Sequence, residues 1–507
     1  MFRRATGAPA GDVPAIEMDQ PQICVTVTGR TMEELCRGRD EALQADIVEL
    51  RLDFAERCDV AAVLSGRRKP VVVTCRPEWE GGAFKGSEEE RRQILMSAAE
   101  LGAEFVDVEA HAAFADQLIR ARNGRGVVLS SHLFDGVPAD LRRRYHNMRA
   151  TGAEIVKVAV LVNSLADTLP LFELAARVSD GESSHHVFVA MGDAGVPTRV
   201  LSARLRNRWT YAGNAIAPGQ LQADRLVKDF RIRRVGADSA LYGVVGLPVM
   251  HSLSPVMHNA GFAALGMKAV YTPMQAADAG DFVRFAKAMG LRGASITAPY
   301  KVALMAAVDE VDTLARRVGA INTIAVRDGR WMGANTDVDG FLRPLAGRIS
   351  LRGVRATVLG AGGAARAVAV ALANQHARVT VSARNRDRAA EIATLADGTA
   401  GPFPPPAGSW DVLINATTAG SRAQPVNPIE GTPLDGEIVF DLVYAPAVTP
   451  LLAAAEQEGC LTIGGLEMLV AQAERQFEIW TGQRPPHGLF HEAALSAIGV
   501  AEASRVV

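Results

Sequence analysis

The first half of the chain alternates short apolar runs, rich in β-branched residues, with longer segments that mix apolar and charged positions. Segment 31–45, which opens on a Thr-x-x-Glu capping signal, and segment 88–100 are typical of the helices between these runs. Strands that alternate with helices form a parallel sheet, and eight of them in about two hundred residues predict a (β/α)8 barrel over residues 21–235. The runs are ICVTVT (23–28), DIVELRLD (46–53), VVVTCRP (71–77), FVDVEA (105–110), GVVLSSHLF (126–134), IVKVAV (155–160), HVFVAMG (186–192) and WTYAGN (209–214).

A lysine interrupts one of these runs. Lys157 lies in GAEIVKVAVLV (152–162), which has the continuous apolar character of a strand buried on both faces. Burying an unpaired ammonium is expensive, so the position needs an explanation. Three interpretations stay open from this window alone. The ammonium reaches water at the strand end, it pairs with a carboxylate, or it is a desolvated amine kept partly neutral for chemistry.

Polar residues of the other runs lie late in each strand. In a barrel, the carboxyl ends of the strands converge on one mouth, where active sites lie. Each residue taken alone is more often structural, but their shared position favours a site. They are Glu49, Arg51, Arg76, Asp107, Glu109 and His132, with Arg199 and Gln220 after the last two strands.

The pattern changes after a polar, basic segment at 229–239, which we interpret as a junction. The second half opens with a strand, a turn and a helix that starts at Pro255, a residue favoured in a first helical turn. The hydroxyls of Ser252 and Ser254 suit recognition of a polyol or, equally, capping of this helix.

A glycine-rich turn is the clearest single motif of the second half. In VRATVLGAGGAARAVAVAL (354–372) a strand runs into G-x-G-G-x-A and directly into a helix, whose N-terminus favours a pyrophosphate. The next strand ends at Arg384 and Arg386, without the acidic residue that binds an NAD ribose. This favours NADP (NADPH) as cofactor, with ordinary surface arginines as the alternative.

Composition and charge exclude several classes of protein. The 507 residues are 48% hydrophobic and 22% charged, with a net charge of −2 that offers no field for nucleic acid. No apolar run reaches the ~18 residues of a membrane span. The five cysteines are scattered without metal-ligand spacing, which fits reduced thiols and no metal site. Residues 1–20 lack a signal-peptide core, so we expect a disordered leader and a cytoplasmic protein.

The motifs ELRLD, CRPEWEGGAFKG, VDVEA, SSHLF, GAEIVKVAV and APGQ, in this order and spacing, resemble the type I 3-dehydroquinate dehydratases. The resemblance implies that Lys157 forms a Schiff base with the C3 ketone of 3-dehydroquinate. That step needs a neutral amine, so the pKa of Lys157 should be lowered from ~10.4 by its apolar strand. It further implies that His132 is the general acid and base and that Glu80 orients it.

The same resemblance assigns the remaining polar residues to substrate binding. Glu49, Arg51 and Arg76 would hold the ring hydroxyls and their surroundings, Arg199 the carboxylate, and Gln220 would bind from a closing loop. Two positions depart from the family: Leu133 replaces Asp or Asn, and Ile216 replaces Ser. We expect activity, with altered contacts in the lid.

The motifs GLPVMHSLSPVMHN, SITAPYK, GAINTI, NTD, GAGGAAR, NATTAG, FDLVYAP and GGLEMLVAQA resemble shikimate dehydrogenase across residues 241–485. The resemblance implies that Lys301 and Asp337 are a catalytic pair that supplies a proton to the C3 oxygen while NADPH delivers hydride. Ser295 and Ala383 replace the usual Asn. Implied shikimate-binding positions are Ser252, Ser254, Thr297, Asn322, Tyr444 and Gln472. Implied cofactor-binding positions are Gly360, Ala361, Gly362, Gly363, Ala364, Arg384, Arg386, Thr417 and Gly465.

Together the two resemblances predict an α/β protein: a TIM barrel followed by a two-lobed dehydrogenase unit with a Rossmann-type NADP-binding lobe. Its substrates would be 3-dehydroquinate and 3-dehydroshikimate, and its product shikimate, with no nucleic-acid or membrane partner and no predicted oligomeric state. Two alternatives remain, a dehydratase fused to a quinate or quinate/shikimate dehydrogenase, and a catalytically dead quinate-pathway regulator. Beyond the barrel, the expected boundaries are 240–345 for the shikimate-binding lobe, 346–465 for the NADP lobe, and 466–507 for C-terminal helices that return to the shikimate-binding lobe.

Overall fold

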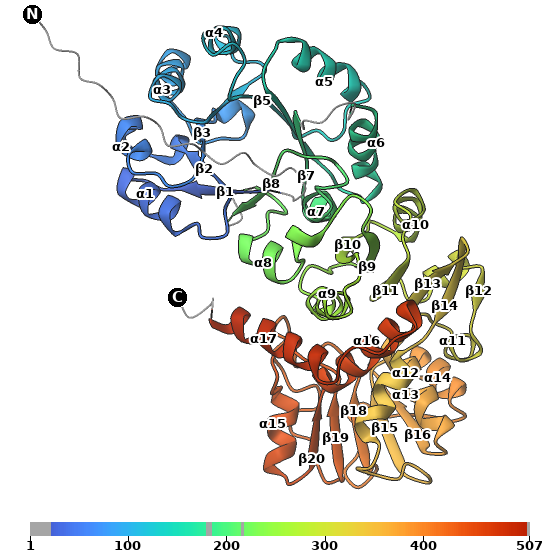
Figure 1. Ribbon diagram of the computed structural model, residues 1–507. Coiled ribbons are helices and arrows are strands. Elements are labelled where there is room, and N and C mark those ends of the chain that lie inside the picture. Colours follow the sequence, from blue (N-terminus) through green and yellow to red (C-terminus); the bar gives the residue numbers. More distant parts are fainter. Residues whose placement is uncertain (1–21, 179–184, 214–216, 504–507) are drawn as a thin grey trace, which may run out of the picture.

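The computed structural model of the chain describes residues 22–178, 185–213 and 217–503. The predicted leader at 1–20 and Ile216 lie outside these residues. Within them the strands form three sheets, seen in Figure 1 as a barrel above two smaller α/β lobes. Among the helices of these ranges, none combines the length and the apolar character that a membrane span requires.

Parallel strands form the first sheet in the order β7-β6-β5-β4-β3-β2-β1-β8, which confirms the predicted (β/α)8 architecture. Where the two end strands meet, the amide of Arg208 donates to the carbonyl of His186 at 2.9 Å. The strands are β1 (Ile23–Thr28), β2 (Ile47–Arg51), β3 (Val71–Thr74), β4 (Phe105–Glu109), β5 (Val127–Leu133), β6 (Ile155–Leu161), β7 (His186–Met191) and β8 (Thr210–Gly213).

Side chains along each barrel strand alternate between the interior and the surrounding helices. Ile47 and Val72 belong to an apolar cluster inside the barrel, whereas Val48 and Leu50 pack outward with the helices. The hydroxyl of Thr31 caps the first helix, as its capping signal predicts. The helices are α1 (Met32–Glu41), α2 (Val60–Leu64), α3 (Glu88–Glu100), α4 (Ala115–Ala121), α5 (Leu141–Ala150), α6 (Leu169–Val178), α7 (Val196–Val200) and α8 (Ala223–Lys228).

The second sheet is mixed and has the order β10-β9-β11-β13-β14-β12. Its strand β13 runs antiparallel to both of its neighbours, β11 and β14. We refer to this sheet and its helices as the substrate lobe. Its elements are β9 (Ala240–Gly246), α9 (Ser254–Ala264), β10 (Ala269–Gln275), α10 (Ala279–Ala288), β11 (Gly293–Ile296), β12 (Glu310–Val311), α11 (Thr313–Val318), β13 (Thr323–Arg327), β14 (Arg330–Ala334) and α12 (Asp337–Leu345).

The third sheet is parallel throughout, in the order β17-β16-β15-β18-β19-β20. The strand order reverses between β15 and β18, and ligands of such sheets bind at the carboxyl ends of the strands at this switch point. We refer to this part as the dinucleotide lobe. Its elements are β15 (Arg355–Leu359), α13 (Gly363–Asn374), β16 (Arg378–Ser382), α14 (Arg386–Leu395), β17 (Thr399–Gly401), β18 (Val412–Asn415), β19 (Ile438–Asp441), α15 (Pro450–Gln457) and β20 (Leu461–Gly464).

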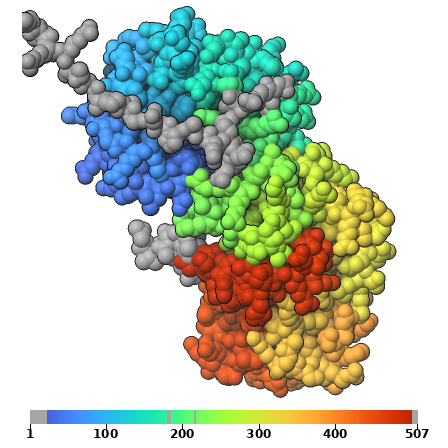
Figure 2. All heavy atoms as spheres, in the orientation of Figure 1, coloured from blue at the N-terminus to red at the C-terminus, as the bar shows by residue number. Residues whose placement is uncertain are grey.

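Two long C-terminal helices return to the substrate lobe. They are α16 (Gly465–Thr481) and α17 (Leu489–Ala503), drawn in red where they cross between the two lobes in Figure 2. Helix α16 packs against α12, and the indole of its Trp480 donates to the carbonyl of Ile324 in β13 at 2.9 Å. The predicted helix at 473–480 is the C-terminal half of α16.

The barrel and the substrate lobe share one apolar core. Val200 of α7 and Met274 of β10 belong to the same cluster and are fully buried. The segment 229–239, interpreted from its polar residues as a junction, contributes to this cluster too, because its Ile232 is fully buried. The two halves therefore meet through packed side chains.

Candidate active sites

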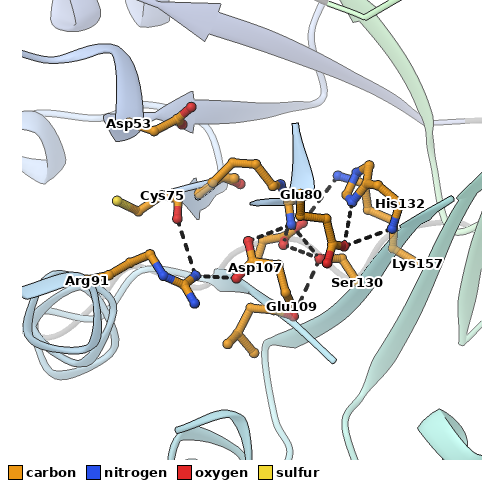
Figure 3. A network of polar contacts seen from close by, with 12 residues as sticks. Asp53, Cys75, Glu80, Arg91, Asp107, Glu109, Ser130, His132 and Lys157 are labelled. Atoms are coloured by element: carbon orange, nitrogen blue, oxygen red, sulfur yellow. Dashed lines mark hydrogen bonds and ion pairs between the residues drawn. The ribbon is translucent and has the colours of Figure 1, made fainter. Parts of the chain in front are cut away.

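Lys157 lies inside the barrel, within a cluster of buried polar side chains (Figure 3). Its Nζ atom is 3.2 Å from Oδ2 of Asp107 and 3.4 Å from Oε1 of Glu49, and it lies 4.3 Å from the ring centroid of Tyr211. The side chain is only 7% exposed. Of the three interpretations left open by the sequence, the structure excludes a solvated strand end and combines burial with pairing to carboxylates.

His132 and Glu80 form a hydrogen-bonded pair beside Lys157 (Figure 3). Glu80 belongs to the 3₁₀ turn η2 (Glu78–Glu80), and His132 to β5. Oε1 of Glu80 accepts the His132 amide at 2.8 Å and lies 3.0 Å from Nδ1. A proton on Nδ1 leaves Nε2 of the imidazole as the acceptor.

The electrostatics of this pair suit a neutral base. Burial, together with the charges of Arg76 and Lys157, lowers the pKa of His132 well below its ordinary value. Burial also raises the pKa of Glu80 to about 7, although Arg76 opposes the shift. At neutral pH the imidazole is therefore uncharged and available to take a proton.

Arg76 is the centre of an ion-pair network behind the pocket. Its guanidinium donates to Asp107 at 2.9 Å, and to Glu109 and Ser130 at 2.7 Å each. Arg91, fully buried on α3, contacts Glu109 from the other side. Burial would raise the pKa of Asp107, but Arg76 and Lys157 lower it below the ordinary range. Asp107 thus links the two cations as a carboxylate.

Arg199 is a buried cation without an anion. It is 2% exposed, and among the described residues no acidic side chain pairs with it. Nη2 donates to the carbonyl of Pro218 at 3.3 Å, while Nε is buried with no partner in that part of the chain. Burial lowers the pKa of Arg199 to about 10. A buried guanidinium without an acidic partner favours the binding of an anionic group.

One pocket at the barrel mouth collects all the barrel residues that the resemblance singled out. Leu133, one of the two departures, instead packs with the core between strands and helices, while its neighbour Phe134 lines the pocket. Arg51 is held at the edge by two 2.8 Å bonds to Asp53. The predicted residues that line the pocket are Glu49, Arg51, Arg76, Glu80, His132, Lys157, Arg199 and Gln220.

A second lysine–carboxylate pair lies in the substrate lobe. Nζ of Lys301 is 2.5 Å from Oδ2 of Asp337, and Nδ2 of Asn322 donates to the other oxygen, Oδ1, at 2.7 Å. The same amide nitrogen lies 3.3 Å from Oε1 of Gln472, so α16 reaches this pair. Four of the predicted residues are thereby brought together.

The remaining predicted shikimate-binding residues lie on three different elements. Ser254 is the first residue of α9, and the oxygen of Ser252 accepts its amide at 3.2 Å. The N-cap residue of α9 is Leu253, whose side chain makes no capping bond, so neither serine is the N-cap residue. Thr297 follows β11, close to Gly246, while Tyr444 follows β19 on the dinucleotide lobe.

Sequence reasoning assigned no role to two residues that form hydrogen bonds with Ser295, which are Tyr271 and Gln476. Ser295 accepts a bond from the hydroxyl of Tyr271 at 2.6 Å and donates to Oε1 of Gln476 at 2.7 Å. Gln476 lies four residues after Gln472, so the helical period could have indicated it. Tyr271 carried no signal, because a tyrosine within an apolar strand is usually part of the core.

The glycine turn between β15 and α13 fits a dinucleotide. Gly360 has φ = +111°, and a Cβ there would lie 2.9 Å from Cγ2 of Thr417. A Cβ on Gly363 would lie 3.1 Å from Cδ of Lys301, so the turn lies directly against the catalytic lysine candidate. Gly362, the N-cap residue of α13, has an extended backbone, no side-chain cap and open space around it. The N-terminal amides of α13 are therefore free of side-chain acceptors.

The other predicted cofactor positions follow the strands of the dinucleotide lobe. Arg384 and Arg386 follow β16 and are exposed, and neither forms an ion pair with another described residue. Thr417 is held by bonds from its amide and hydroxyl to Oδ1 of Asn415. Gly465 begins α16, where a Cβ would lie 2.2 Å from the carbonyl oxygen of Leu442. Ala361 and Ala364 complete the turn and the first turn of α13.

Comparison with known proteins defines the class of each half. Residues 23–236 match the family of type I 3-dehydroquinase, residues 244–324 the substrate-binding domain of shikimate dehydrogenase, and residues 465–495 the C-terminal domain of shikimate 5'-dehydrogenase. The chain thus combines a lyase barrel with a dehydrogenase.

A relative of the whole chain combines the same two parts. The chloroplastic bifunctional 3-dehydroquinate dehydratase/shikimate dehydrogenase of Arabidopsis thaliana is 32% identical over 92% of this chain and 83% of its own length. The NADP(+) shikimate dehydrogenase of Shouchella clausii is 40% identical over 48% of this chain and 94% of its own length. A solved shikimate dehydrogenase in complex with NADP+ is 33% identical, with a TM-score of 0.49, over 52% of this chain and 97% of that one. The chain belongs to the bifunctional 3-dehydroquinate dehydratase/shikimate dehydrogenase family.

Proposed function

We propose that the chain dehydrates 3-dehydroquinate to 3-dehydroshikimate in the barrel and reduces 3-dehydroshikimate to shikimate, with NADPH, in the second half. The observation that carries the proposal is a buried lysine that shares one pocket with a histidine, whose pKa burial lowers, and with an arginine that pairs with no acidic side chain of the described residues. A carbonyl substrate with a carboxylate and acidic α-protons matches these three groups.

For the dehydration, Nζ of Lys157, as the free amine, attacks the C3 ketone, and loss of water gives a protonated imine. His132 removes the C2 proton, which the imine acidifies, and returns it to the departing C1 hydroxyl, which leaves as water. Hydrolysis of the imine releases 3-dehydroshikimate and the lysine. Glu80 stabilises the imidazolium that forms, and Arg199 binds the carboxylate.

For the reduction, Lys301 and Asp337 hold the proton that the substrate oxygen needs. Nζ of Lys301 donates to the C3 oxygen, and Asp337, 2.5 Å away, replaces or relays that proton. Asn322 fixes the orientation of the aspartate through Oδ1. NADPH, when bound, supplies the hydride to the C3 carbon.

The residues of the dinucleotide lobe support NADP as the cofactor. The open space at Gly362 and the uncapped start of α13 would hold the pyrophosphate. Arg384 and Arg386 would hold the 2′-phosphate. We take the domain boundaries to be 21–235, 240–345, 346–465 and 466–507. We also propose a cytoplasmic location, supported by the five cysteines, none of which is paired in a disulfide in the described residues.

The test is to supply purified protein with 3-dehydroquinate and NADPH and to follow shikimate and NADP. Formation of shikimate through 3-dehydroshikimate is the expected result. Preferential reduction of 3-dehydroquinate itself would identify a quinate dehydrogenase in the second half. Absence of turnover in both half-reactions would contradict the enzyme and favour the regulator.

A further inference from the structure

The loop after the Lys157 strand is held by a residue of the other half. Loop 162–168 leaves the carboxyl end of β6, at the mouth of the barrel. The amide of Leu165 donates to Oδ2 of Asp281 at 3.0 Å, and the amide of Ala166 donates to Oδ1 at 2.8 Å. Asp281 belongs to α10 of the substrate lobe, so both bonds cross between the two halves.

Asp281 is fully buried and is held almost entirely by backbone donors. Its Oδ2 also accepts the amide of Ala277, from its own lobe, at 2.9 Å. The nearest cation is the largely exposed Arg284, 3.9 Å from Oδ1. The carboxylate lies at the start of α10 and at the start of the helical segment of η3 (Ala166–Thr168) and α6, where the helix dipoles favour an anion. A single carboxylate therefore caps one helical start in each half.

The loop shares an apolar cluster with the helix that carries Arg199. Leu165 is fully buried in the same apolar cluster as Val196 and Val200 of α7. Helix α7 lies against β10 of the substrate lobe. A shift of Leu165 would therefore disturb the apolar core that contains Val196 and Val200 of α7. The guanidinium of Arg199, on the same helix, would then change its position in the pocket.

We propose that Asp281, a residue of the substrate lobe, is a positioning residue of the dehydratase site. It fixes loop 162–168, the loop supports α7, and α7 places Arg199 for the substrate carboxylate. The inference rests on the proposed dehydratase function. Lys157 is itself held within the β5–β6–β7 ladders, opposite Ser130 and Val187, so it does not depend on Asp281.

The test separates substrate binding from catalysis in the full-length chain. Both carboxylate oxygens of Asp281 accept backbone N–H groups. In Asp281→Asn, an NH2 group replaces one of these oxygens, so at least one backbone N–H group loses its acceptor. We expect the KM for 3-dehydroquinate to rise about tenfold, with kcat of dehydration changed less than about twofold. A variant that only unfolds more easily would instead lose kcat at constant KM. Unchanged KM, or that loss of kcat alone, would overturn the proposal.

Asp278→Asn is the matched control. Asp278 caps the same helix, by accepting the Asp281 amide at 2.7 Å, and its cap survives as asparagine. This variant should leave the KM for 3-dehydroquinate unchanged, and a rise equal to that of Asp281→Asn would overturn the proposal.

A second test measures the binding of 3-dehydroquinate by calorimetry in the absence of turnover. It compares the Lys157→Ala chain with the same chain that also carries Asp281→Asn. The dissociation constant should rise about tenfold when Asp281→Asn is added, and an equal constant overturns the positioning role. Absence of dehydration by the unaltered chain would contradict the proposed function instead, so the two failures are distinguishable.

Discussion

At the scale of single residues, the two halves use lysine in different surroundings. Nζ of Lys157 lies between two carboxylates and over the ring of Tyr211, and the same pocket holds Arg199, which has no acidic partner among the described residues. Lys301 pairs with one carboxylate at 2.5 Å and borders the glycine turn of the dinucleotide lobe. The first arrangement suits covalent attachment to a carbonyl, and the second suits transfer of a proton beside a bound cofactor.

Removing either lysine should abolish one activity and spare the other. In Lys157→Ala, dehydration of 3-dehydroquinate should fall by roughly 10³-fold or more, because no amine remains to form the imine. Reduction of 3-dehydroshikimate should stay within about twofold of the unaltered chain. Borohydride should trap a substrate adduct on the unaltered chain and on Lys301→Ala, the matched control. Loss of both activities in either variant would contradict separate sites.

Dehydration should weaken in acid because of Glu80, whose pKa is raised to about 7 by burial. As pH falls through about 7, Glu80 takes up a proton and can no longer stabilise an imidazolium on His132. The rate should therefore be full above this pH and fall below it, and the apparent pKa belongs to the pair. In Glu80→Gln, kcat should drop by roughly 10²-fold and this acid limb should vanish from the pH profile. An unchanged limb would assign the titration to another group.

At the scale of elements, the barrel was predictable because strand and helix segments alternate regularly along the first half of the sequence. The sequence also placed polar residues late in each strand, and most of these side chains line one pocket at the mouth. Asp107 and Glu109 instead bind Arg76 in the network behind it. The sequence could not show which of these residues pair. Asp107 faces Lys157 because of the interior packing of the closed barrel, and Arg91 reaches Glu109 from a helix outside it. Such contacts depend on three-dimensional register, which spacing along one strand does not encode.

Substitutions at two glycines of the turn between β15 and α13 test whether this turn binds the pyrophosphate of NADPH. Gly360→Ala forces a side chain into a backbone with φ = +111° and against Thr417, so both stability and NADPH binding should suffer. Gly362→Ala adds a methyl group to open space at φ = −102° and should leave the melting temperature unchanged. Both variants should raise the KM for NADPH, by roughly tenfold or more, and leave dehydration intact. Unchanged KM in Gly362→Ala would argue against a pyrophosphate at this helix start.

At the scale of the whole molecule, the core that joins barrel and substrate lobe could not be read from sequence. Apolar residues of 229–239 are hidden among basic ones, and no sequence pattern marks Asp281 as a contact with the barrel. Neither pattern shows which surface another domain will cover. The shared core nevertheless implies that these two parts unfold together, because exposing either face would uncover the other.

Met274→Ala should reveal this coupling. The side chain is fully buried on β10, in the cluster that also contains Val200 of the barrel, so its truncation should cost about 2–5 kcal/mol. Dehydration and reduction should then be lost at the same, lower temperature when the two activities are followed during heating. The control, Phe440→Ala, removes an equally buried side chain from the core of the dinucleotide lobe. It should lower the temperature at which reduction is lost and leave dehydration near its original value. If Met274→Ala also spared dehydration, the barrel would be stable without the lobe, and the contacts across this core would serve only to hold two independent enzymes together.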